Sequence, residues 1–84
     1  MNWNINYGNL PPHMRGPFKR YIENRISMGS FGTALVENNL SRAFATADHI
    51  NTAAMQDIVE WMHWEAPSDC WGTPAKVTAW LEGE

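Results

Sequence analysis

The chain has 84 residues and a formal net charge of −3, and hydrophobic residues make up 44% of it. This apolar fraction excludes a disordered chain, and a lone cysteine, Cys70, excludes an intramolecular disulfide and fits a reducing compartment. No stretch approaches the roughly 20 apolar residues of a membrane span, and the first residues lack the pattern of a signal peptide. We therefore expect a single domain over residues 1–84, located in the cytoplasm.

The N-terminal segment, residues 1–9, is predicted to be an extended arm. Trp3, Ile5 and Tyr7 alternate with asparagines, which is the period of a strand. A lone strand has no partner in a helical chain, so the arm would pack on the helices, stay loose or pair with another subunit.

The first helix is predicted from Phe18, Ile22 and Ile26, which recur at helical spacing. Pro17 removes a backbone donor, so it either begins this helix or kinks an earlier one. Gly29 is the expected C-terminal stop.

A second helix is predicted over 31–47, with Ser30 as its N-cap. Asn38 and Asn39 lie in its middle, where asparagine is a poor helix former. Their position indicates a side-chain role, either in capping or bridging helices or in contacting a ligand.

A break is expected at 48–52, with Asn51 or Thr52 as the cap of a third helix that Pro67 ends. Its apolar face comprises Met55, Ile58, Val59 and Met62. Thr73-Pro74 has the pattern of a final helix start, with threonine as the cap. The fold class predicted is therefore all-α, a small bundle of about four helices.

Four of the six Lys and Arg residues fall within residues 13–25, whereas the rest of the chain carries two basic and eight acidic side chains. A basic segment in an acidic chain is typical of an anion site. In this hypothesis Arg15, Lys19 and Arg20 hold a phosphate, and Tyr21 stacks on a base. The alternative is a solvated helix face. The candidate ligand-binding residues are Arg15, Lys19, Arg20, Tyr21, Asn38 and Asn39.

No catalytic or metal-binding pattern stands out, and we expect neither an enzyme nor a cofactor. The three histidines and Cys70 match no familiar zinc spacing, and Cys70 is expected to be a buried or idle thiol. The acidic residues around Glu60 are interpreted as a solvated face. The remaining aromatic group, Trp61, Trp64, Trp71 and Trp80, is expected in the core or a subunit interface, and an exposed member would mark a partner site.

Several motifs occur in a fixed order along the chain. They are Gly8-Asn9-Leu10-Pro11, His13-Met14-Arg15-Gly16, Arg20-Tyr21-Ile22-Glu23, Gly29-Ser30-Phe31, Val36-Glu37-Asn38-Asn39-Leu40, Ala47-Asp48, Ala66-Pro67-Ser68, and Trp71-Gly72 followed by Pro74, Lys76-Val77 and Ala79-Trp80. In this order the chain resembles a family of small proteins encoded by phages and prophages, whose role is not established. The resemblance implies an accessory protein of phage type and carries over no catalytic residue.

Charge and resemblance together predict a non-catalytic antagonist of host defence in the host cytosol. It would sequester an anionic, nucleotide-like small molecule or block a host defence protein. The large aromatic supply favours a homo-oligomer. The alternatives are a small nucleic-acid-binding or transcription regulator, which the negative net charge disfavours, and a minor structural or assembly factor.

Overall fold

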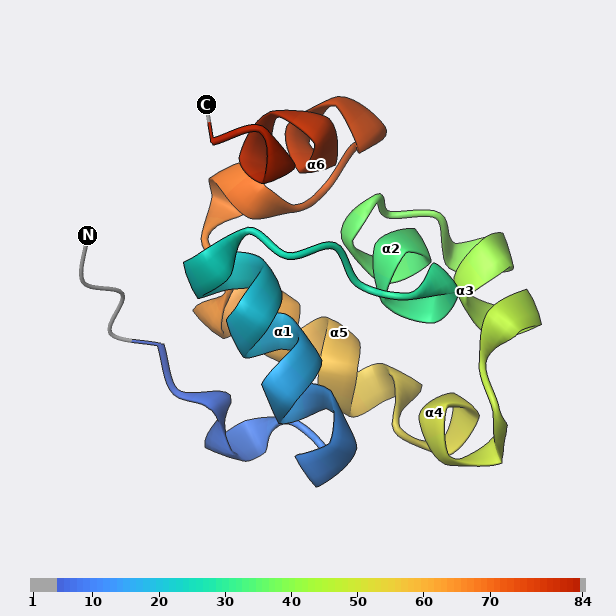
Figure 1. The fold of residues 1–84 in the computed structure, drawn as a ribbon. Coiled ribbons are helices and arrows are strands. Elements are labelled where there is room, and N and C mark those ends of the chain that lie inside the picture. Colours follow the sequence, from blue (N-terminus) through green and yellow to red (C-terminus); the bar gives the residue numbers. More distant parts are fainter. Residues whose placement is uncertain (1–4, 84) are drawn as a thin grey trace.

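The structure is a computed structural model that describes residues 5–83. Over this range the fold is all-α, as predicted, with no strand (Figure 1). Two 3-10 turns, η1 (Tyr7–Asn9) and η2 (Ser68–Cys70), accompany the helices α1 (Pro12–Asn24), α2 (Ser30–Val36), α3 (Leu40–Thr46), α4 (His49–Ala53), α5 (Met55–Glu65) and α6 (Pro74–Leu81). The described residues thus hold six α-helices rather than about four.

The N-terminal segment is only partly described, since Trp3 lies outside residues 5–83. Tyr7–Asn9 forms the turn η1 instead of the end of an extended arm. The Asn6 side chain caps this turn by accepting a 2.8 Å hydrogen bond from the Gly8 amide. A short polar side chain competes here with the extended backbone that the alternating pattern predicts.

Helix α1 continues through Pro17 and ends earlier than expected. It begins at Pro12, where proline is tolerated in the first turn, and runs to Asn24. Arg25 takes a left-handed conformation with φ of 55°, and this stops the helix before Gly29. As a result Ile26 lies outside the helix and is exposed rather than part of its apolar stripe.

The predicted helix over 31–47 is two helices, α2 and α3. Asn38 adopts a left-handed φ of 61°. A right-handed helix cannot continue through this conformation, so α2 ends before it. Asn39 then caps α3, because its side chain accepts a 3.1 Å hydrogen bond from the amide of Arg42. The capping role expected of this asparagine pair is confirmed for Asn39.

The expected break at 48–52 contains the short helix α4. Its cap is Asp48, whose side chain accepts a 2.8 Å hydrogen bond from the Asn51 amide. The final helix starts as predicted: the Thr73 side chain accepts from the Lys76 amide at 3.1 Å, and Pro74 is the first helical residue.

Buried side chains of α1, α2, α5 and α6 form the core, with smaller contributions from α3 and η2. In Figure 1 α1 crosses in front of α5, α6 lies above them, and α2 and α3 lie to one side. The Phe18 and Trp61 rings join α1 to α5 with centroids 4.9 Å apart. Trp80 of α6 donates its indole N–H to the Tyr21 backbone carbonyl of α1 at 3.0 Å. Among residues 5–83, no helix has the length and apolar character needed to cross a membrane.

Candidate functional site

The exposed face of α1 carries the central pair of the predicted anion site. Lys19 and Arg20 are exposed, and neither side chain forms a hydrogen bond or ion pair with the described part of the chain. Arg20 folds back along the helix over Gly16, where a Cβ would lie 3.0 Å from its Nη1. Glycine at this position therefore leaves room for the guanidinium.

The third predicted cation, Arg15, is exposed, but its guanidinium is already bonded to the backbone of the chain. The Arg15 guanidinium donates to the carbonyls of Leu10 at 3.1 Å and Gly8 at 3.0 Å, and so fixes η1 against α1. Two of its donors are therefore unavailable to an anion. The sequence pattern gives no indication of this contact, because it depends on how η1 folds back.

Tyr21 is buried, with 1% of its surface exposed, and cannot stack on a ligand. Its hydroxyl donates to the Cys70 backbone carbonyl at 2.6 Å. Burial, with smaller contributions from Cys70 and Glu37, raises the pKa of this hydroxyl. The stacking role proposed for Tyr21 is therefore wrong, since its side chain belongs to the core.

Asn38 and Asn39 line a different site. They line an apolar cavity of about 170 Å³ between the α2–α3 turn and α5. His63 and Trp71 also line it, with their ring centroids 4.9 Å apart in an edge-to-face arrangement. Lys19 and Arg20 do not line this cavity, so the six predicted ligand-binding residues do not form one site.

Cys70 is buried, as expected. Burial raises the pKa of its thiol to about 12, and neighbouring Asp69 adds to the shift while a backbone hydrogen bond opposes it. The thiolate needed for nucleophilic attack is thus disfavoured. In the described range no group of three or more His, Cys, Asp or Glu residues could hold a metal ion.

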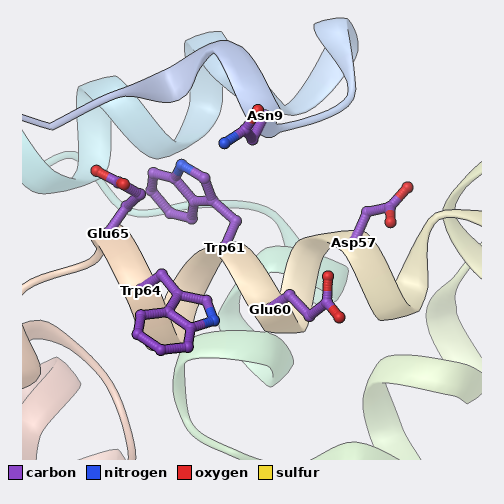
Figure 2. A pocket seen from close by; sticks show the side chains of 6 residues that line it. All are labelled: Asn9, Asp57, Glu60, Trp61, Trp64 and Glu65. Carbon is purple, nitrogen blue, oxygen red and sulfur yellow. The ribbon is translucent and has the colours of Figure 1, made fainter.

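A hollow on α5, about 400 Å³ in volume, is the functional candidate that the sequence did not reveal. Figure 2 shows its lining side chains, Asn9, Asp57, Glu60, Trp61, Trp64 and Glu65. The sequence pattern predicts only a solvated face for its acidic members, Asp57, Glu60 and Glu65. Trp64 is 83% exposed, so it is a tryptophan to which the expectation of a partner site applies.

A second exposed surface is apolar. Leu40 and Phe44 of α3 are 56% and 48% exposed, and they border an open hollow of about 620 Å³ that reaches Val59 and Glu60 of α5. Glu60 also lines the Trp64 hollow, so the two surfaces adjoin along α5.

Comparisons of the chain with protein-family models, curated protein sequences and solved structures found no match.

Proposed function

We propose that this protein is a non-catalytic accessory protein of phage type that antagonises host defence by sequestering an anionic, nucleotide-like ligand. The exposed, unpaired cations Lys19 and Arg20 are the observation that carries this proposal. They are adjacent on one helix in a chain whose net charge is −3. Such local positive charge attracts phosphate, and arginine adds bidentate hydrogen bonding.

In this proposal two side chains of α1 hold the ligand. Lys19 and Arg20 supply the charge, whereas Arg15 stabilises η1 and Tyr21 stabilises the core. Base stacking by α1 is therefore not part of the proposal. The resemblance to small phage proteins supports the biological setting.

The test measures the binding of adenosine diphosphate by native mass spectrometry and by calorimetry. Adenosine, which lacks the charged phosphates, is the control ligand. We expect saturable binding that the double variant Lys19→Gln/Arg20→Gln abolishes. Arg42→Gln/Lys76→Gln removes the same charge at other exposed positions and should bind like the parent. Equal binding by both double variants would refute the proposal.

A second candidate, the blocking of a host protein, is favoured by the exposed Trp64. Large aromatic side chains dominate the energetics of protein interfaces. In this candidate function the host protein would bind Trp64 and the hollow beside it on α5, and not Lys19 and Arg20 on α1.

A further inference from the structure

Helix α5 presents an acidic and aromatic face to solvent. Asp57, Trp61 and Glu65 recur every four residues, and Glu60 and Trp64 are also four residues apart, so the five side chains form two neighbouring rows on α5. In Figure 2 the Asp57 and Glu65 carboxylates stand toward the two ends of the hollow, with Trp61 between them and Trp64 on the neighbouring side of α5. Three of the six lining side chains are thus carboxylates.

Two of the side chains that line this hollow, Trp61 and Glu65, are held by contacts within the fold. The Trp61 indole donates its N–H to the Asn6 carbonyl at 2.7 Å, and its ring packs on Phe18 and Tyr7. Glu65 accepts the Asn6 amide at 3.1 Å, which holds one carboxylate in place. A face held in this way loses little conformational entropy when a partner binds.

The charge of this face is one-sided. No lysine or arginine occurs in α5 or lines the hollow. Carboxylates around an indole favour a cation, because the aromatic face attracts positive charge and the carboxylates accept its hydrogen bonds. The chain already contains such a pair: the Arg25 guanidinium lies 4.2 Å from the Trp80 ring centroid.

We propose that the acidic Trp64 face of α5 binds an arginine-bearing segment of a protein partner. An arginine of the partner stacks on Trp64 and pairs with Glu60. Arginine fits better than lysine because its planar guanidinium stacks and hydrogen-bonds at once. The proposal deepens the host-protein candidate and is independent of anion binding, since the two surfaces share no residue.

The probe is a fluorescein-labelled oligo-arginine peptide, with binding followed by fluorescence anisotropy. Trp64→Ala leaves the charge unchanged, and we expect it to weaken binding by roughly tenfold or more. Trp64→Phe keeps a ring and should bind better than Trp64→Ala. Oligo-lysine should bind more weakly than oligo-arginine.

Charge is tested with a matched pair of double variants. Asp57→Asn/Glu60→Gln should weaken binding severalfold more than Asp69→Asn/Glu82→Gln, which removes the same charge from exposed positions outside the hollow. Equal effects of the two, or full binding by Trp64→Ala, would show attraction by net charge alone and overturn the proposal. Circular dichroism of each variant verifies the fold.

Sedimentation tests whether a second copy of this chain, and not a different protein, occupies the face. If Lys19 and Arg20 of a second copy fill the face, the protein alone will self-associate, and both Trp64→Ala and Lys19→Gln/Arg20→Gln will abolish that association. This result would overturn the proposal. We expect instead that Lys19→Gln/Arg20→Gln leaves peptide binding intact, so failure of the anion site would not be mistaken for failure of this one.

Discussion

Tyr21 connects α1 to the later elements η2 and α6. Its hydroxyl donates to the carbonyl of Cys70, and its own carbonyl accepts the indole N–H of Trp80. Next to it, Arg25 donates to the Trp80 carbonyl while its guanidinium stacks on that indole. These contacts lie in or beside the core, where hydrogen bonds are costly to leave unmade.

The Cys70 thiol and two tyrosine hydroxyls near this contact should make the folded protein less stable at alkaline pH. Burial raises the pKa of the Cys70 thiol from 9.0 to about 12, and it also raises the pKa values of Tyr21 and Tyr7. Above pH 9.0 the unfolded chain releases a thiol proton that the folded chain retains. The free energy of unfolding should therefore fall as pH rises, by at most about 1.4 kcal/mol per pH unit for each group.

Urea unfolding at about pH 7.5 and at about pH 10.5 measures this loss. Cys70→Ala removes the contribution of the thiol to this pH dependence. The free energy of unfolding of the variant should therefore change less between the two pH values. Identical pH dependence in the two proteins would contradict the assignment to Cys70.

At the residue scale, the sequence shows which side chains are charged and which are apolar. It does not show which of them form hydrogen bonds within the fold. Lys19 and Arg20 are exposed as predicted, whereas Arg15 binds carbonyls that only the folded η1 turn brings near. Tyr21 is both aromatic and polar, so its type fits a binding surface as well as a core. Its partner, the Cys70 carbonyl, is 49 residues away in the chain and has no sequence pattern.

The α2–α3 turn shows where helix prediction failed at the scale of elements. Apolar residues recur over 31–47 as in one helix, because α2 and α3 both pack on the same core. Left-handed backbone at Asn38 and the cap at Asn39 divide them. The asparagine pair is an unfavourable feature for a helix, but the hydrophobic periodicity across it still predicts one continuous helix. Element type was thus predictable, whereas the boundaries depended on single backbone conformations.

Loss of the Asn39 cap should destabilise the protein. Asn39→Ala leaves the Arg42 amide without its side-chain acceptor and should lower the free energy of unfolding by about 1 kcal/mol. Asn39→Asp keeps an acceptor at the cap and should cost much less. Urea unfolding compares the two variants, and equal losses would rule out capping as the cause.

For the molecule as a whole, the apolar surface on α3 and α5 supports the proposed homo-oligomer. Leu40 and Phe44 remain exposed beside an apolar hollow, which a second copy could cover. We expect sedimentation to show a mass above that of one chain. Phe44→Lys should shift the protein toward the monomer.

Ile26→Lys is the matched control, since Ile26 is also 48% exposed but does not border this hollow. It should leave the mass unchanged. A parent protein that sediments as a monomer at micromolar concentration would contradict the proposed assembly.

The contacts of Tyr21 also have a consequence for synthesis on the ribosome. Cys70 and Trp80 are translated 49 and 59 residues after Tyr21. At about 5–20 residues per second, the apolar face of α1 waits roughly 3–10 s for the first of these partners. During that interval Phe18, Tyr21 and Ile22 lack these partners, so we expect the nascent chain to favour chaperone binding before the fold can close.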